Sequence, residues 1–348
     1  MSHARIVGAG LIGTSIALGL SERGWTIDIS DRDEKVATLA KDLLQPSLKT
    51  DSPDLVVIAT PPSEVMDALQ GEFMRYPNAT FIDVASIKTK LLLEVERLPA
   101  LSERFVGTHP MAGREIGGAH SAQADLFRGR AWIITPTQKS SLDALAMARK
   151  VIEELGATSY EMKAENHDEL MARISHLPQV VSTALATSVI KGGGLDLAGQ
   201  GLRDMTRLAN SDGSLWSEIL IGNKEEVSKS IKEFINALSA LEAEISAKES
   251  VAIKNIFQTS KSARELISGK HGKQARPYSY LRIVIEDRPG QLSNIIADCS
   301  EIDANIEDLA IEHSPGQFTG LITLAFLEDS ADQVQKHLQD KGWRVHLA

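Results

Sequence analysis

The sequence predicts an α/β protein with three successive parts: an N-terminal Rossmann-type doubly wound sheet, an all-helical dimerisation domain and a small C-terminal α+β domain of the ferredoxin-like class. Up to about residue 160, short apolar runs alternate with stretches of helical periodicity, as expected for parallel strands joined by crossover helices. Strand-like runs then cease, and strand and helix patterns return after a polar stretch that contains glycine and proline breakers. The predicted boundaries are residues 1–160 for the sheet, 161–268 for the helices, 269–277 for a linker and 278–348 for the last domain.

Composition excludes several classes of function. The formal net charge of −10 argues against a nucleic-acid partner, because phosphate binding requires clustered Lys and Arg. No apolar run reaches the length of a membrane span, and the N-terminus enters a strand and a glycine turn without an export signal. Cys299 is the only cysteine, so no intrachain disulfide and no thiolate metal cluster can form. We therefore expect a cytoplasmic protein without a metal site.

The first strand, "ARIV", leads into the motif "GAGLIG" and then directly into a helix. Glycines in G-x-G-x-x-G spacing allow a tight turn, a close approach of pyrophosphate to the backbone, and close packing of the helix on the strand. The N-terminus of the helix then presents free N–H groups to the phosphates. The motif predicts a dinucleotide-binding site formed by Gly8, Gly10, Leu11, Ile12 and Gly13.

The second strand, "TIDIS", leads to Asp31, close to the offset expected for a carboxylate that binds the ribose 2′-hydroxyl of NAD. The next residue, Arg32, could instead pair with the 2′-phosphate of NADP, and Asp31 could simply be a solvated helix cap. We expect NAD as the cofactor. The turn "ATPPSE", predicted to follow the fourth strand, places Thr60 and Pro61 on the nicotinamide side.

Two later loops follow predicted strands and carry polar groups suited to chemistry. "DVASIKTK" contains Ser86, and "VGTHPMAGRE" contains His109. Because loops at the carboxyl ends of strands line the active crevice of an open sheet, His109 is predicted to lie where a substrate binds. Histidine is the side chain best suited to proton transfer near neutral pH, although a histidine in a loop can also cap a backbone carbonyl.

The helical zone carries apolar residues at helical spacing in "NHDELMARISHLPQVVSTALATSVI" and "EEVSKSIKEFINALSALEAEISA". Apolar-faced helices without a second layer need a partner surface, so we expect a homodimer. His176 in "ISHLP" could act on a substrate or could only satisfy a backbone carbonyl. The glycine-rich loop over residues 192–201 is expected to bring the segment that begins at Arg203 and ends at Arg207 close to the nucleotide domain.

The sequence resembles the prephenate and arogenate dehydrogenases of tyrosine biosynthesis over nearly the whole chain. The resemblance rests on "GAGLIGTS", "DVASIK", "GTHPMAG", "ISHLP" and "GLRDMTRLANSDGSLWSEI". It implies an NAD-dependent oxidoreductase that acts on a small molecule. It further implies catalytic roles for His109, Ser86 and His176, and a substrate site formed by Arg207, Gln179, Glu115, Asp204 and Arg203. Gln179 stands where the family often has a second histidine. The choice between prephenate and arogenate as the substrate therefore stays open. A neutral residue there favours prephenate, which has no ammonium group.

The chemistry of prephenate suits these residue types. Hydride leaves the carbinol carbon for nicotinamide, and carbon dioxide leaves as the ring becomes aromatic. Neutral His109 can accept the hydroxyl proton, and the fork of Arg207 can hold the side-chain carboxylate. A β-hydroxy acid dehydrogenase of the same architecture would be expected to use a lysine in the helical zone, and no lysine lies beside "SHLP". A noncatalytic sensor of dinucleotide and amino acid is a further alternative, against which His109, Ser86 and Arg207 together argue.

Residues 278–348 resemble an ACT domain, a regulatory module that binds amino acids. The resemblance rests on "EDRPGQL" and "ANIEDLAIEH". It implies feedback inhibition by an aromatic amino acid, tyrosine above all, at an interface between two such domains. The alternative is a purely structural dimerisation module. The effector residues that the resemblance implies are Asp287, Pro289, Gly290, Leu292, Asn305 and Ile306.

Overall fold

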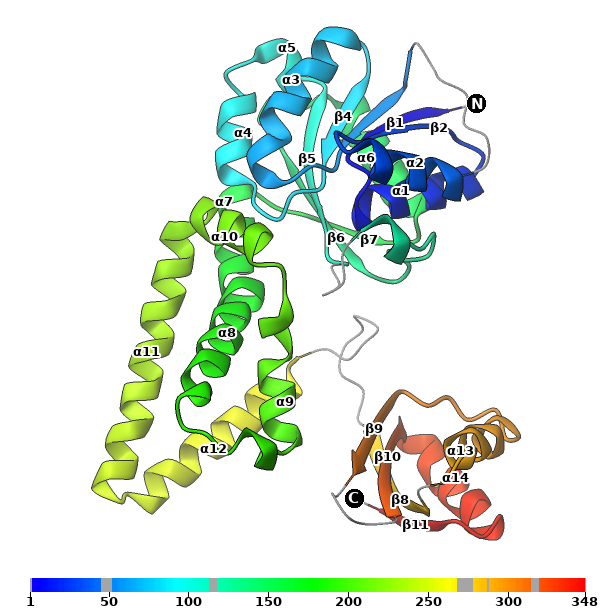
Figure 1. Ribbon diagram of the computed structural model, residues 1–348, viewed down its shortest axis with the longest axis vertical. Coiled ribbons are helices and arrows are strands. Elements are labelled where there is room, and N and C mark those ends of the chain that lie inside the picture. Colours follow the sequence, from blue (N-terminus) through cyan, green and yellow to red (C-terminus); the bar gives the residue numbers. More distant parts are fainter. Residues whose placement is uncertain are drawn as a thin grey trace. The chain divides into compact units, whose positions relative to one another are not determined.

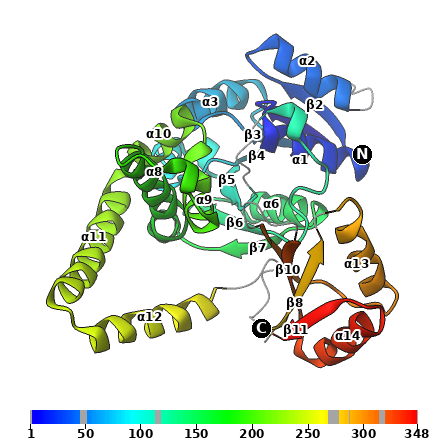
Figure 2. The same cartoon turned by 60° about the horizontal axis from the view of Figure 1, so that its bottom comes forward.

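The computed structural model describes residues 2–44, 52–112, 118–267, 278–286, 288–313 and 319–347. The chain divides into two compact units, residues 1–253 and 254–348, and each is described by itself. Figures 1 and 2 show a sheet covered by helices and a group of long helices in the first unit, and a small sheet with helices packed against it in the second. Within the described ranges, no helix is both long enough and apolar enough to cross a membrane.

A seven-stranded sheet forms the first part of unit one, in the order β2-β1-β3-β4-β5-β6-β7. The first five strands are parallel to one another, as the sequence predicts. The prediction is wrong for the last two, because β6 runs antiparallel to β5, and β7 runs parallel to β6. The described part of the β5–β6 connection holds a short 3-10 turn and no crossover helix, and a strand returning without a crossover lies antiparallel to its neighbour. The strands are β1 His3–Val7, β2 Thr26–Ser30, β3 Leu55–Ile58, β4 Thr80–Asp83, β5 Phe105–Pro110, β6 Ala131–Pro136 and β7 Thr158–Glu161.

Helices cover both faces of this sheet, which confirms the doubly wound prediction. Alternation along β3 shows the two faces directly, because Val57 packs into one apolar cluster while Val56 and Ile58 pack into the other. The first cluster includes residues of α1 and α6, and the second includes residues of α3 and α4 (Figure 1). The helices are α1 Leu11–Glu22, α2 Glu34–Leu43, α3 Val65–Arg75, α4 Thr89–Val95, α5 Pro99–Ser102 and α6 Leu142–Glu154.

The order of the strands reverses at β1, whose neighbours are β2 on one side and β3 on the other. Open α/β sheets bind ligands in the crevice at such a switch point, beyond the carboxyl ends of the strands. The turn that begins at Ala59 follows the third strand here. The prediction that it follows the fourth strand is wrong. Among the described residues before β3, only β1 and β2 are strands, and residues 34–43 form helix α2.

The zone from Ala164 to Glu265 is helical, as predicted. The helix that begins with α7 continues through a π-helical turn, Ala172–His176, into α8. Pro178 explains the irregularity, because proline has no N–H for the carbonyl four residues earlier and its ring clashes with that carbonyl. The π turn therefore sits at the "ISHLP" motif. The helices are α7 Ala164–Met171, α8 Leu177–Ile190, α9 Gln200–Thr206, α10 Gly213–Gly222, α11 Lys224–Ala247 and α12 Ser250–Glu265.

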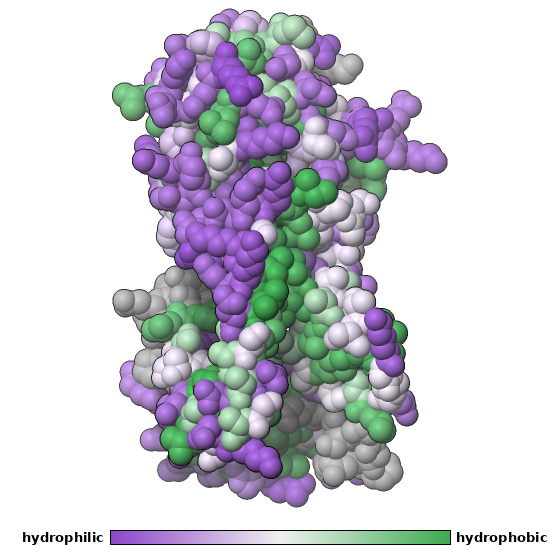
Figure 3. Space-filling view, turned by 90° about the vertical axis from the view of Figure 1, so that its left-hand side faces the viewer, coloured by the Kyte–Doolittle hydropathy of each residue, from purple (hydrophilic) through white to green (hydrophobic). Residues whose placement is uncertain are grey.

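The long helices leave apolar side chains exposed. Figure 3 shows a hydrophobic band beside a strongly hydrophilic strip on one face of the molecule. An exposed apolar band of this kind marks an interaction surface. Aliphatic side chains of the helical zone that are more than half exposed include Ile174, Ile190, Ile221, Ile235, Leu238 and Ile245.

Unit two contains a four-stranded antiparallel sheet in the order β11-β8-β10-β9. Its chain order, strand–helix–strand–strand–helix–strand, is the one predicted from the sequence. Both helices contribute buried side chains to a single apolar core, among them Cys299 of α13 and Leu338 of α14. The elements are β8 Tyr278–Glu286, α13 Gln291–Ser300, β9 Asp308–His313, β10 Thr319–Leu327, α14 Glu328–Asp340 and β11 Arg344–Leu347.

The contact of α1 with the turn before it leads to a prediction about stability. A Cβ at Gly13 would lie 2.0 Å from the carbonyl oxygen of Gly8, so Gly13→Ala forces backbone to move. We expect it to lower the free energy of unfolding by about 1–3 kcal/mol, as overpacking does elsewhere. Gly10→Ala is the matched control, because a Cβ there meets no atom within 4 Å. Urea denaturation of both variants measures the difference, and equal losses would contradict the steric argument.

Candidate active site

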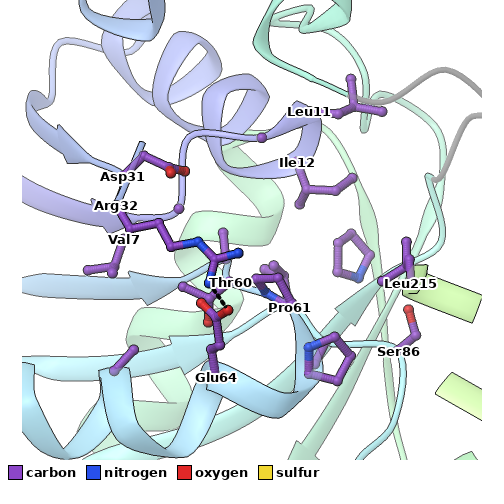
Figure 4. A pocket seen from close by; sticks show the side chains of 18 of the residues that line it. Val7, Leu11, Ile12, Asp31, Arg32, Thr60, Pro61, Glu64, Ser86 and Leu215 are labelled. Atoms are coloured by element: carbon purple, nitrogen blue, oxygen red, sulfur yellow. Dashed lines mark hydrogen bonds and ion pairs between the residues drawn. The ribbon is translucent and has the colours of Figure 1, made fainter. Parts of the chain in front are cut away.

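A cavity of about 890 Å³ opens at the carboxyl ends of β1, β3, β4 and β5. Ten of the residues that the sequence predicts for the cofactor and active site line it. In Figure 4, Asp31 lies at one end of this cavity and Ser86 lies at the other, with Leu215 of α10 close to Ser86. The ten residues are Gly8, Gly10, Leu11, Ile12, Asp31, Arg32, Thr60, Pro61, Ser86 and His109.

The glycine motif has the geometry that a dinucleotide requires. Gly8 has a φ of +102°, and a Cβ there would lie 2.4 Å from the carbonyl oxygen of Ala59, so both the turn and the close packing need glycine. Gly10 borders the cavity and has open space where a side chain would stand. Gly13 does not line the cavity, and its part is the close packing of α1 on the turn. Helix α1 begins at Leu11 with no acidic side chain in its first turn, which leaves its N–H groups suited to an anion.

The end of the cavity opposite Ser86 carries Asp31 and Arg32, the charged residues predicted to determine the preference between NAD and NADP. The carboxylate of Asp31 accepts hydrogen bonds from the backbone N–H groups of Ala9 (2.8 Å) and Asp33 (2.9 Å), which orient it beside the glycine turn. Arg32 forms an ion pair with Glu64, from the turn after β3 (Figure 4). The guanidinium that could have met a 2′-phosphate therefore already has a carboxylate partner.

His109 lies at the end of β5, where its ring borders the cavity. Its Nδ1 lies 2.9 Å from Nε2 of His167, and the two rings meet edge to face with centroids 5.1 Å apart. Burial, with smaller effects of His167, Lys88 and His176, lowers the pKa of His109 well below its usual value. His109 is therefore neutral at physiological pH, the state that a general base needs.

His167 and Asp168, two neighbours in α7, stand behind His109. Nδ1 of the fully buried His167 lies 2.7 Å from Oδ1 of Asp168. The same carboxylate accepts the backbone N–H groups of Lys88 (2.9 Å) and Thr89 (2.8 Å). Burial opposes ionisation of Asp168, but the hydrogen bonds from His167 and Thr89 outweigh it and lower its pKa. A contiguous chain of contacts thus runs from the cavity through His109 and His167 to an ionised carboxylate.

A buried ion pair closes the loop that carries Ser86, and its carboxylate also bonds the strand that carries His109. Lys88 is fully buried, and its ammonium contacts Asp83 Oδ2 at the end of β4. Burial lowers the pKa of Lys88, although the charge of Asp83 opposes this. Asp83 also accepts the backbone N–H groups of Ala85 (2.9 Å) and Thr108 (3.1 Å), which hold the residues next to Ser86 and His109. The pair therefore sets the spacing of the two predicted catalytic side chains.

His176 does not line the cavity. It is buried, and its Nδ1 lies 3.2 Å from the side-chain amide nitrogen of Asn223, which also donates to the backbone carbonyl of Asp168 (2.8 Å). Its ring meets Trp216 edge to face at 6.0 Å. Burial lowers the pKa of His176 to about 4, so it is neutral. These contacts connect the π turn with α7 and the start of α11, and a catalytic role for His176 stays a prediction.

Four of the predicted substrate-binding residues are described by the structure, and they lie outside the cavity lining. Gln179 is buried and donates to the backbone carbonyl of Leu208 (2.7 Å), which ties α8 to the segment after Arg207. Arg203, Asp204 and Arg207 are exposed, in α9 and the 3-10 turn that follows. Glu115 lies outside the described residues. The structure thus does not bring the four described residues to the cavity lining. Contact of all five with substrate stays a prediction.

Patterns in the sequence did not single out His167, Asp168 or Asp83, and they placed Lys88 in the loop of Ser86 without its buried partner. One signal in the sequence could have found His167. It stands three residues after Ala164 and four before Met171, on the face of α7 that is buried, where a histidine next to an aspartate is out of place unless both are paired. Across the residues that the structure describes, no group of three or more His, Cys, Asp or Glu side chains is arranged to hold a metal ion.

The predicted effector residues that the structure describes in unit two lie in separate places. Asn305 borders a hollow of about 280 Å³ together with Ser330 and Gln333. Gly290 precedes α13 with a φ of +89°, and Pro289 beside it is exposed. Leu292 and Ile306 pack against the core, and Asp287 lies outside the described residues. Gly290 follows β8 and Asn305 precedes β9, and the register of both strands on β10 shows that they lie far apart. Glu286, at the end of β8, pairs with Thr319, whereas Asp308, at the start of β9, pairs with Ala325. These two positions are six residues apart on β10, or about 20 Å.

Comparison with known proteins decides the family. The family model described as "Prephenate dehydrogenase, nucleotide-binding domain" matches residues 16–161, and "Prephenate dehydrogenase, dimerization domain" matches residues 163–259. The chain belongs to the prephenate dehydrogenase family. The prephenate dehydrogenase of Bacillus subtilis is 28% identical over 93% of this chain and 92% of its own length.

Two solved structures resemble the chain. Prephenate dehydrogenase from A. aeolicus, in complex with hydroxyphenyl propionate and NAD+, has a TM-score of 0.71 and 30% identity, covering 76% of this chain and 97% of that one. Synechocystis arogenate dehydrogenase has a TM-score of 0.65 and 28% identity, covering 75% and 98%. The structures similar to this chain thus include a complex with NAD+, and their names refer to two dehydrogenases, one of prephenate and one of arogenate.

The low pKa of His176 leads to a prediction about acid stability. Between the ordinary pKa of 6.5 and the folded value of about 4, the unfolded state binds a proton that the folded state does not. Stability conferred by neutral His176 is therefore present above pH 6.5 and is lost as the pH falls towards 4, by up to about 3 kcal/mol. Thermal denaturation between pH 7 and pH 4 should show a shallower loss for His176→Gln than for the parent. His346→Gln, at an exposed position of β11, is the control, and identical profiles for all three proteins would contradict the assignment.

Proposed function

We propose that this chain is an NAD-dependent prephenate dehydrogenase, which converts prephenate to 4-hydroxyphenylpyruvate by oxidative decarboxylation. The observation that carries the proposal is the position of His109. A neutral histidine borders the same cavity as the glycine turn, Asp31 and Ser86, and its Nδ1 contacts His167. Family membership supplies the substrate class, and the cavity supplies the place for the cofactor.

NAD fits the residues at the switch point. The open side of Gly10 and the first turn of α1 would take the pyrophosphate, and Asp31 would take the ribose hydroxyls. NADP fits less well, because its 2′-phosphate would meet the carboxylates of Asp31 and Glu64. When bound, NAD supplies the hydride acceptor.

The chain's own residues then handle the proton and the charges. His109 takes the proton of the ring hydroxyl as the carbon–oxygen bond becomes a carbonyl, and Ser86 holds that oxygen. When the ring carboxylate leaves as carbon dioxide, the electrons of the broken bond enter the ring, and the oxygen takes the proton back from His109. Arg207 is proposed to bind the side-chain carboxylate, with Arg203 and Asp204 as ionic partners and Glu115 as a gate.

The same reaction on arogenate would give tyrosine directly, and arogenate dehydrogenase stands among the related structures. Gln179 favours prephenate, because an uncharged amide offers no counter-ion for the ammonium group of arogenate. We also propose a cytoplasmic homodimer. The dimerisation description of the matched family model and the exposed apolar residues of the helical zone support the dimer.

Steady-state kinetics test the proposal and the role of His109 together. We expect reduction of NAD with prephenate at a higher kcat/KM than with arogenate or with NADP. His109→Asn should lower kcat by ~10²-fold or more and leave the Kd for NAD nearly unchanged, because the side chain acts on the proton and not on the nucleotide.

Absorbance of reduced nicotinamide measures turnover, and fluorescence titration measures NAD binding. Near-normal turnover by His109→Asn would remove the assignment of the base. A parent enzyme that reduces NAD faster with arogenate would reverse the substrate preference.

A second function is proposed for unit two, as an ACT module that binds tyrosine and inhibits the enzyme. Its element order supports this, and so does the register of its sheet. Gly290 and Asn305 lie at opposite ends of β10 within one module, so a ligand that touches both would have to lie between two modules. Inhibition then requires that tyrosine bind two states of the enzyme unequally.

A tyrosine titration of the full chain and of a chain ending at Ser268 tests this function. We expect inhibition of the full chain and none of the shorter one. Equal inhibition of both would place the effector site in the catalytic part, and no response of the full chain would leave unit two as a structural module.

A further inference from the structure

We propose that His167 and Asp168 form a positioning pair that holds His109 in one tautomer, with the proton on Nδ1 and the lone pair on Nε2. Nε2 is then the nitrogen available to the cavity. The inference rests on the proposed function, since it concerns the base of that reaction. It assigns His167 and Asp168 the task of fixing the tautomer of His109, in addition to their packing between α7 and the sheet.

The direction of every hydrogen bond in the chain follows from Asp168. Its carboxylate already accepts two backbone N–H groups, from Lys88 and Thr89, and a backbone N–H can only donate. An ionised carboxylate is acceptor-only, so the contact of 2.7 Å with His167 is a bond that His167 Nδ1–H donates. The proton of His167 is thereby placed on Nδ1.

A neutral histidine protonated on Nδ1 has its lone pair on Nε2. Nε2 of His167 is the atom that lies 2.9 Å from Nδ1 of His109, so His109 must donate there. Its own proton is therefore on Nδ1, and Nε2 is free to accept the substrate's proton. The opposite tautomer would leave two lone pairs facing each other in a buried contact.

A doubly protonated His167 would reverse this result, because it would donate to His109 from Nε2 and leave the proton of His109 on the cavity side. The surroundings of His167 oppose that state. It is fully buried, burial lowers its pKa despite the bond to Asp168, and the ammonium of the buried Lys88 adds a repulsive charge. The neutral form of His167 is the one consistent with the site.

The pair also links the base to the docking of the helical segment. His109 belongs to the sheet, whereas His167 and Asp168 belong to α7, and Asp168 reaches back to the backbone at the start of α4. Asn223, which precedes α11, donates to the carbonyl of Asp168 and fixes this end of α7. The tautomer of His109 thus depends on how α7 sits against the sheet.

Two substitutions of His167 test its two hydrogen bonds separately: the bond that Nε2 accepts from His109 and the bond that Nδ1–H donates to Asp168. The amide of His167→Gln reaches about as far as Nε2 and can accept from His109. The shorter amide of His167→Asn can still donate to Asp168 but does not reach His109. We expect His167→Gln to keep kcat within about threefold of the parent and His167→Asn to lose ~10-fold or more, as when the partner that orients a histidine is removed elsewhere. The Kd for NAD and the KM for prephenate should change little in either variant.

Nitrogen-15 NMR of histidine-labelled protein with NAD bound reads the tautomer without any turnover. In the parent, Nδ1 of His109 should carry the proton and Nε2 should not, with the signals assigned by their loss in His109→Asn. His167→Asn should give a mixture of tautomers, and His167→Gln should restore the parent spectrum. A parent spectrum with the proton on Nε2 would overturn the proposal even if both variants failed to fold, and so would equal kcat values for both variants. A parent that binds NAD with the expected tautomer but does not oxidise prephenate would instead contradict the proposed function.

Discussion

The carboxylate of Asp168 is the constraint on which the site depends. It is buried, and three donors converge on it: the side chain of its neighbour His167 and two backbone N–H groups of the loop that carries Ser86. A buried carboxylate is stable only when its oxygens are hydrogen-bonded, so α7 and the sheet must meet in this one arrangement. The orientation of His109 follows from that meeting and not from β5 alone.

The buried charge pair of Asp83 and Lys88 performs a similar task. Asp83 and Lys88 are both fully buried, and neither would be tolerated there without the other. Because Asp83 also bonds the backbone of Thr108, the ends of β4 and β5 are held together, and the side chains that follow them stay within reach of one substrate. Rigid support of this kind is what a base and a positioning hydroxyl need, since small displacements of either reduce catalysis.

The opposite end of the cavity is governed by sterics. Gly8 and Gly13 pack so closely against Ala59 and each other's backbone that only glycine fits, whereas Gly10 faces open space. One motif therefore contains two different requirements, close packing and room for a ligand. The strand order places this motif beside the turn after β3, so the cofactor end and the His109 end belong to a single crevice.

Local patterns in the sequence were enough to predict the doubly wound sheet, the helical zone, the element order of the last domain and ten residues that line the cavity. Each of these depends on periodicity, on glycine geometry or on the position of a loop after a strand. The reversed direction of β6 and β7 depends instead on a connection whose lack of a crossover helix no periodicity reveals. Only the tertiary structure brought His167 and Asp168 behind His109, since 58 residues separate the two histidines in the chain and their contact depends on how α7 packs. It also left Arg207, Arg203 and Asp204 outside the cavity lining, because the position of α9 is set by packing on α8 that the sequence pattern does not encode.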